Sequence, residues 1–265
     1  MPHLSPLASD LPLAVRRLYQ DLLINQPLLT RYALFMLLLA LPTTVLLWAD
    51  ERIYREVAIW AKPLKFMLST ALFAATTAWC VGLLPSAVRT SSSVRAVAWA
   101  LVLTSAFEVA YISLQAAWGQ GSHHNVATPF HALMFGLMAL AAVGLTATQA
   151  VLAWMLLRHC GLGSGTLVQA AVLGLALTFV LATASGFILG AQQPPAGMGW
   201  PLVGWHWGQA DARPAHFLGV HAQQLFPWLG WMLVRRSAPH PGGLLMAAAG
   251  AYVVVWGLLI YSAAP

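Results

Sequence analysis

The residues best suited to chemistry gather in the stretch 199–224, where a polar loop rich in glycine and tryptophan leads directly into an apolar segment. The segment begins near Pro214 and carries His216 and His221. Proline is suited to the first turn of a helix, because its missing N–H group would have no partner there. The sequence therefore predicts that His216 lies in the first turn of a membrane-spanning helix and that His221 lies deeper.

Imidazoles within a membrane can ligate a metal ion, but two on one helix must be spaced correctly. His216 and His221 are five positions apart, which is roughly 140° around a helix and about 7.5 Å along it, so further ligands must come from other helices. His131 and Glu108, in other apolar runs, are the candidates. We expect a site in which the three histidines bind zinc, iron or copper and Glu108 is a ligand or general base.

Glu108 is the one acidic residue deep inside a predicted span, about 15 Å from its end. A carboxyl group at that depth must be protonated, paired or in contact with water, and such groups mark functional sites. Residues at helical spacing around it are polar or aromatic, namely Thr104, Tyr111, Gln115 and Trp118. This face is predicted to point into the bundle.

Three loops lead into helices through similar tetrapeptides: Lys62-Pro63-Leu64-Lys65, Thr128-Pro129-Phe130-His131 and Arg213-Pro214-Ala215-His216. Each places a proline at a helix start and a basic or imidazole side chain two residues later. Snorkelling lysines and ordinary helix starts would explain the pattern without a site. The alternative is an electropositive mouth for a phosphate or carboxylate, formed by three helix N-termini.

The same register puts His131 and His216 at equal depth, so we expect their side chains to share an ion or a water molecule. Other polar residues near the mouth are expected to contact the substrate. The predicted substrate-binding set is Lys62, Lys65, Gln115, His124, Asn125, Asp211, Arg213 and Gln224. His123 is ranked with His124 below His131, because adjacent loop histidines are often simply solvated.

The composition is that of a membrane protein. Of the 265 residues, 60% are hydrophobic and only 8% are charged, against about 25% charged in a soluble domain. The net charge of +6 comes from basic residues scattered over the loops rather than clustered on one face, so no nucleic-acid partner is expected.

Seven apolar runs are long enough to cross a bilayer: 32–48, 64–84, 96–118, 130–157, 166–190, 214–234 and 244–262. Residues 1–30 are predicted to form an amphipathic cytoplasmic segment whose helix lies on the membrane surface, and residues 31–265 are predicted to form the seven-helix domain. Eight Lys and Arg residues fall on the N-terminal side and five on the other. This bias predicts a cytoplasmic N-terminus and a periplasmic C-terminus.

Two motifs, WAKPLKF at 60–66 and GWPLVGWHWGQADARPAHFLGVHAQQ at 199–224, resemble a family of uncharacterised bacterial multi-pass membrane proteins. The resemblance implies a bacterial inner-membrane location and no particular activity. A likeness to the zinc-dependent ceramidase and progestin-receptor type of membrane hydrolase fails, because those proteins space their histidines four apart.

The sequence thus predicts an all-α polytopic membrane protein, with a metal-dependent enzyme acting on an amphipathic or anionic substrate as the leading function. A transporter or channel with Glu108 as a proton relay is an alternative. A haem b protein with two histidines as axial ligands is another. The lipid bilayer and an anionic small molecule are the expected partners.

Overall fold

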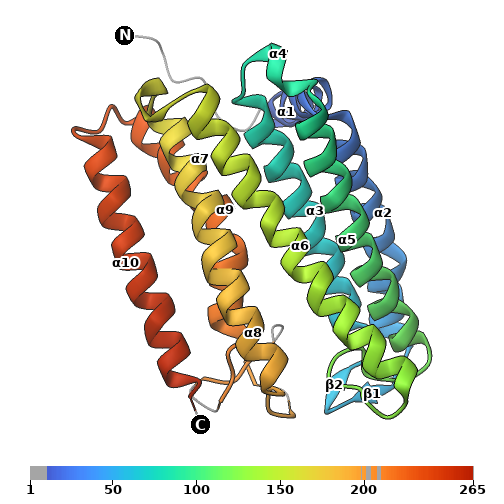
Figure 1. Cartoon of the computed structure of the whole chain (residues 1–265). Helices are drawn as coiled ribbons and strands as arrows, with labels where there is room; N and C mark the ends of the chain where they lie inside the picture. Colours follow the sequence, from blue (N-terminus) through green and yellow to red (C-terminus); the bar gives the residue numbers. More distant parts are fainter. Residues whose placement is uncertain (1–10, 198, 201–203, 208–209, 265) are drawn as a thin grey trace.

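The structure is a computed structural model that describes residues 11–197, 199–200, 204–207 and 210–264. It consists of a helical bundle with one short hairpin (Figure 1). The long elements are α1 (Leu11–Asn25), α2 (Pro27–Ala49), α3 (Ala61–Gly82), α5 (Ser92–Ala117), α6 (Pro129–His159), α7 (Thr166–Leu177), α8 (Thr183–Ala191), α9 (Arg213–Arg235) and α10 (Pro241–Ser262). The short elements are β1 (Ile53–Tyr54), β2 (Val57–Ala58), α4 (Ser86–Arg89), the 3-10 turn η1 (Leu162–Ser164) and the π-helical segment η2 (Thr178–Ala182).

Six helical segments in the described part of the chain are long and apolar enough to cross a membrane: α2, α3, α5, α6, α10 and the continuous run from α7 through α8. The predicted all-α polytopic membrane protein is thereby confirmed in outline. The remaining predicted span corresponds to α9, which has 23 residues but a lower hydropathy. Its histidines and glutamines are the reason.

The helices form a ring with two outer members. The contacts run from α3 to α5, α5 to α6, α6 to α7, α7 to α9, and back from α9 to α3. Helix α2 packs outside this ring against α3, and α10 packs outside it against α9. Helix α1 lies across the end of the bundle where α4 also lies, whereas the C-terminus is at the opposite end (Figure 1).

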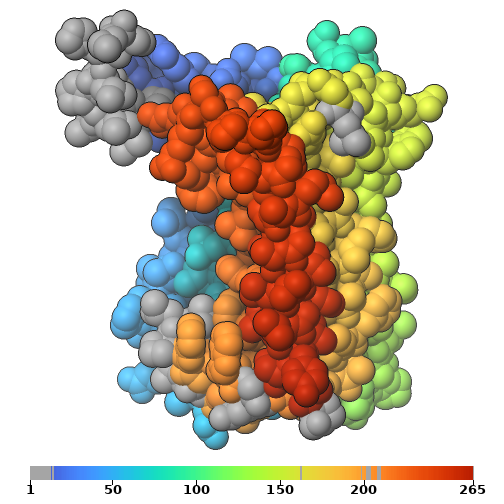
Figure 2. All heavy atoms as spheres, turned by 90° about the vertical axis from the view of Figure 1, so that its left-hand side faces the viewer, coloured from blue at the N-terminus to red at the C-terminus, as the bar shows by residue number. Residues whose placement is uncertain are grey.

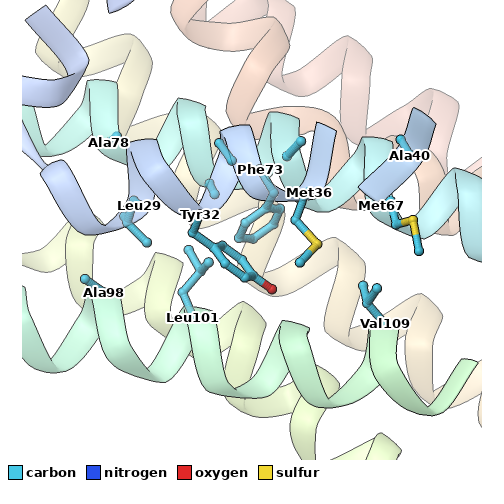
Figure 3. Packing of buried hydrophobic residues seen from close by; sticks show 13 residues of the cluster. Leu29, Tyr32, Met36, Ala40, Met67, Phe73, Ala78, Ala98, Leu101 and Val109 are labelled. Atoms are coloured by element: carbon cyan, nitrogen blue, oxygen red, sulfur yellow. The ribbon is translucent and has the colours of Figure 1, made fainter. Parts of the chain in front are cut away.

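The largest apolar core joins α2, α3 and α5. Figure 3 shows Tyr32 and Met36 of α2 packed with Phe73 of α3 and Leu101 of α5. The Tyr32 hydroxyl lies 2.9 Å from Ser105 Oγ, which satisfies a buried polar group on each helix. This core fixes the positions of α3 and α5, the two helices that carry the lysines and Glu108.

Helices α7 and α9 approach each other closely because glycines line their contact. A Cβ atom at Gly219 would lie 2.6 Å from the backbone nitrogen of Ala182, and one at Gly174 would lie 2.9 Å from the carbonyl oxygen of Ala222. The π-helical segment η2 lies at this crossing, where Thr178 Oγ1 accepts a hydrogen bond of 2.9 Å from the backbone N–H of Gln223. Small residues at a helix crossing are the usual device for close packing within membranes.

The three helix starts predicted at Pro63, Pro129 and Pro214 agree with the structure to within two residues. Pro129 is the first residue of α6, and the hydroxyl of Thr128 caps it by accepting from the backbone N–H of His131. In α3 and α9 the helix begins earlier than expected, so Pro63 is the third residue and Pro214 the second. Backbone hydrogen bonds from within the preceding loops extend these first turns, as His216 N to Ala212 O shows.

Candidate functional site

The three loops predicted to lie on one side do meet at one end of the bundle, beside the C-terminus (Figure 1). The β1–β2 hairpin joins them: Arg52 Nη1 donates to the carbonyl of Ala117 at 2.9 Å, and Arg55 Nη2 donates to the carbonyl of Pro194 at 2.6 Å. The side of the membrane on which they lie stays a prediction. The hairpin, which the sequence analysis did not predict, thus links the loop before α6 to the loop before α9.

Lys62 is the centre of the site. Its Nζ atom lies 2.9 Å from His123 Nδ1 and 3.0 Å from Ser122 Oγ, so the second residue of α3 holds the loop before α6. The hydroxyl of Ser122 is itself 3.1 Å from His123 Nδ1. When Lys62 is protonated it can only donate, and His123 then accepts at Nδ1 and carries its proton on Nε2.

Burial lowers the pKa of His123 well below its ordinary value. The positive charge of Lys62, and the neighbouring His124 and His216, act in the same direction. His123 is therefore a neutral acceptor at pH 7. Its ring also packs against Phe66 of α3 and Phe135 of α6, with centroids 6.2 and 6.1 Å away.

Glu108 faces this group from α5 and is 7% exposed. It interacts electrostatically with Lys62, and no hydrogen bond joins its carboxyl group to any other residue that the structure describes. The expectation that Glu108 points into the bundle therefore agrees with its burial. Lys62 is the charge to which it is coupled.

Arg213 and Lys65 extend the positive region toward α9. Lys65 interacts electrostatically with both Arg213 and Asp211, and Lys62 with both Lys65 and Arg213. Asp211 is fully buried at its side chain, and Arg213 binds it with Nε to Oδ1 at 2.8 Å and Nη2 to Oδ2 at 2.7 Å. Burial raises the pKa of Asp211, but hydrogen bonds from Arg213 and from the backbone of His206 outweigh it and the net shift is downward.

The predicted histidines are bound by separate partners. His131 is held beside its own helix start, with Nδ1 2.8 Å from Thr128 Oγ1 and Nε2 3.0 Å from Gln120 Oε1. His216 lies at the α8 side of α9, with Nδ1 3.1 Å from Ser185 Oγ. No hydrogen bond or ring contact joins His131 to His216, so the structure gives them no shared partner.

His221 is turned toward its own helix. Its Nδ1 atom lies 3.2 Å from Gln224 Oε1, and its ring is 4.2 Å from that of Phe217. Trp205 continues this aromatic contact from the preceding loop, 5.0 Å from Phe217. Within the described residues there is no group of three or more His, Cys, Asp or Glu side chains that is arranged to hold a metal ion.

The remaining predicted substrate residues differ in their surroundings. Asn125 folds onto its own loop, donating to Gly121 O at 3.1 Å and accepting from Ala127 N at 3.3 Å. The His124 ring packs against Phe135 at 4.9 Å. Gln115 is completely buried and donates to the Tyr111 hydroxyl. Asn125 is thus occupied in shaping the loop.

Two close neighbours of Lys62 were missed or ranked too low in the sequence analysis. Ser122 was not considered, and His123 was placed below His131. Their only signal was the position of the loop between α5, which carries Glu108, and α6, because a loop serine and a loop histidine are ordinary residues until tertiary structure buries them. Ser185, the partner of His216, was not predicted for the same reason.

Comparison with known proteins adds no relative that would assign this site. Its chemistry rests on the residues described above, with Lys62, His123, Glu108 and Arg213 as the charged and hydrogen-bonding centre. Neither a protein-family model, nor a curated protein, nor a solved structure matches the chain.

Proposed function

We propose that this protein is a seven-helix membrane transporter or channel that binds an anionic group between α3 and α9, with Glu108 exchanging a proton. The count of seven includes α9, which is a member of the ring and packs between α7 and α3. An odd number of crossings also accords with the placement of α1 and the C-terminus at opposite ends of the bundle (Figure 1). The inner membrane of a bacterium, with the N-terminus cytoplasmic, remains the proposed location.

The observation that carries the proposal is the concentration of positive charge. Lys62, Lys65 and Arg213 interact with one another electrostatically, and like charges held together destabilise a protein unless an opposite charge accompanies them. Asp211 already binds Arg213. Glu108 interacts with Lys62, and an anion bound at the mouth would add negative charge beside all three cationic side chains.

Transport is favoured over catalysis at a single site, because pairs of polar side chains recur between the helices of the ring. Thr146 Oγ1 of α6 lies 2.9 Å from Thr183 Oγ1 of α8, and Thr77 of α3 donates to Gln149 of α6 at 3.5 Å. Gln223 of α9 is fully buried, and neither of its amide atoms has a hydrogen-bond partner among the described residues. Buried polar groups without protein partners are commonly bound by water or by a passing solute.

Binding can be tested on the purified protein in detergent with inorganic phosphate and with citrate as probes at constant ionic strength. We expect a saturable rise in thermal stability that Lys65→Gln weakens by about tenfold or more, the loss typical of one hydrogen bond to a charged group. Arg95→Gln is the control, because Arg95 is an exposed arginine at the opposite end of the bundle, where it donates to the carbonyl of Thr90. Equal loss in both variants, or no saturable effect of either probe, would contradict the proposal.

The role of Glu108 is tested separately in proteoliposomes that contain a pH-sensitive dye. An inward gradient of the bound probe should drive proton movement in the wild type and not in Glu108→Gln, whereas probe binding in detergent should persist in that variant. Proton movement that survives Glu108→Gln would remove Glu108 from the mechanism.

A second candidate is hydrolysis, favoured by the contact between Ser122 Oγ and Lys62 Nζ at 3.0 Å. A serine hydroxyl beside a lysine amine is one of the recurring nucleophile and base pairs. A fluorophosphonate probe should then label the wild type but not Ser122→Ala, while Ser185→Ala should label normally. Absence of labelling at Ser122 in the wild type would leave transport as the function to pursue.

A further inference from the structure

A groove follows the outer side of α9, away from the candidate site. Leu225, Trp228, Met232 and Arg235 line it at spacings of three and four residues, so they form one stripe along the helix. Leu225 is two positions from the inward-facing Gln223, roughly 200° around the helix. Figure 2 shows the side of the molecule on which α10 forms the outer surface beside α9.

Two adjoining cavities make up the groove and share Trp228. The first has a volume of about 330 Å³ and is lined by Trp228, Trp231, Met232, Arg235 and Arg236. The second has a volume of about 190 Å³, lies between α9 and α10, and is lined by Leu225, Phe226, Trp228, Leu229, Ala248 and Tyr252. The first is basic at its end and the second is apolar and aromatic.

The two arginines are positioned for an anion outside the protein. Both are exposed at the end of α9, and neither forms an ion pair with any residue in the described part of the chain. The Arg235 guanidinium lies 5.2 Å from the centroid of the Trp231 ring, which holds it over the cavity that both residues line. The planar guanidinium group of arginine presents N–H donors in a geometry that matches the oxygens of a phosphate group.

The length of the groove matches one lipid chain. Ten residues separate Arg235 from Leu225, which is about 15 Å of helix and half of the roughly 30 Å hydrocarbon core of a bilayer. An apolar chain that begins at the arginines would therefore run along Trp228 and Leu229 and end near the middle of the membrane. The T-shaped contact between Phe226 and Tyr252, with centroids 5.5 Å apart, closes the far end of this path.

We propose that this groove binds one molecule of an anionic glycerophospholipid, with the phosphate between Arg235 and Arg236 and one acyl chain between α9 and α10. The site is independent of the proposed transport function, because it shares no residue with the mouth at the other end of α9. Its consequence is that the lipid fills the gap beside α10, a helix in which only Leu245 and Ala249 are buried.

The experiment is native mass spectrometry of the purified full chain with short-chain phosphatidylglycerol or phosphatidylcholine added at equal concentration. We expect one molecule of phosphatidylglycerol to bind in preference to phosphatidylcholine. Removing both arginines in Arg235→Ala/Arg236→Ala should reduce that preference by about fivefold for each arginine. Arg158→Ala is the matched control, because Arg158 also lies over a tryptophan, Trp154, at 5.7 Å but lines neither cavity.

A second pair of variants tests the acyl path without altering charge. Ala248→Phe fills the groove and should abolish the bound lipid, whereas Ala247→Phe, on the exposed side of α10, should not. The proposal is overturned if Arg158→Ala has the same effect as the double variant, if phosphatidylcholine binds equally well, or if inorganic phosphate alone displaces the lipid. A second copy of the chain in place of lipid would overturn it as well.

Discussion

At the scale of single residues, the state of His123 controls the junction of α3 with the loop before α6. His123 accepts from Lys62 only while it is neutral. Its pKa is lowered by burial and by Lys62, so the unfolded chain takes up a proton more readily than the folded one. By linkage, stability is full above the ordinary histidine pKa of about 6.5 and falls as the pH drops below it.

The prediction is therefore a loss of stability in mild acid that His123→Asn reduces. Between pH 7 and pH 5 the wild type should lose up to about 1.4 kcal/mol per pH unit through this group, measured by unfolding in detergent at each pH. His159→Asn, an exposed histidine at the other end of the bundle, should leave the slope unchanged. An unchanged slope in His123→Asn would show that other groups are responsible.

Asp211 is the second residue whose ionisation matters for the fold. Its two oxygens accept from the Arg213 side chain, from the Arg213 backbone and from the His206 backbone, and its pKa is lowered in net. The stability that it contributes is full above the ordinary aspartate pKa of about 3.9 and is lost as the pH falls toward the folded value.

Asp211→Asn should lower the free energy of unfolding by about 1–3 kcal/mol at pH 7, because charge-assisted hydrogen bonds at a buried side chain are replaced. Asp50→Asn is the comparison. Its ion pair with Arg52 should contribute less to the free energy of unfolding, because the Arg52 side chain is about half exposed. Equal effects of the two substitutions would mean that burial of Asp211 is unimportant.

At the scale of elements, the crossing of α7 and η2 with α9 depends on glycine. A Cβ atom at Gly219 would approach three backbone atoms of Leu181 and Ala182 within 2.9 Å. Backbone cannot move aside as a flexible side chain can, so Gly219→Ala should separate the helices and destabilise the protein by about 1–3 kcal/mol.

The matched control is Gly250→Ala in α10, where nothing lies within 4 Å of the added Cβ. It should be neutral or slightly stabilising, because alanine favours a helix over glycine. Thermal unfolding of both variants in the same detergent is the measurement. A neutral Gly219→Ala would show that α9 is not packed as closely as described.

At the scale of the whole molecule, the orientation in the membrane decides which compartment the mouth faces. In a chain with Cys80→Ala and Cys160→Ala, Val126→Cys lies in the loop before α6 and Ser93→Cys at the opposite end. Both native positions are exposed. The excess of Lys and Arg near Ser93 predicts that this end is cytoplasmic.

An impermeant maleimide should therefore label Val126→Cys in intact spheroplasts and Ser93→Cys only after lysis. The opposite pattern would reverse the topology, so that the mouth would face the cytoplasm. Labelling of both positions before lysis would mean that the spheroplasts had leaked. Release of a soluble cytoplasmic marker protein into the medium detects such leakage.

The sequence by itself determined the class of the protein and the approximate positions of six of its membrane-spanning helices. Hydropathy and proline or cap residues act over a few neighbouring positions, so they sufficed for six spans and for the start of α6 at Pro129. Helical spacing likewise predicted that Glu108 would be buried. These are local properties of the sequence, and they do not depend on how the helices pack against one another.

Only the tertiary structure decided which polar side chains meet. The depth of His131 and His216 follows from their positions after proline. Their hydrogen-bond partners depend instead on the rotation of each helix and on the paths of the loops. His131 contacts Gln120, and His216 contacts Ser185. The same freedom brought Ser122 and His123 into contact with Lys62, which is 60 and 61 positions away in the sequence. Contacts between distant segments are selected by the packing of the whole ring, which no local pattern encodes.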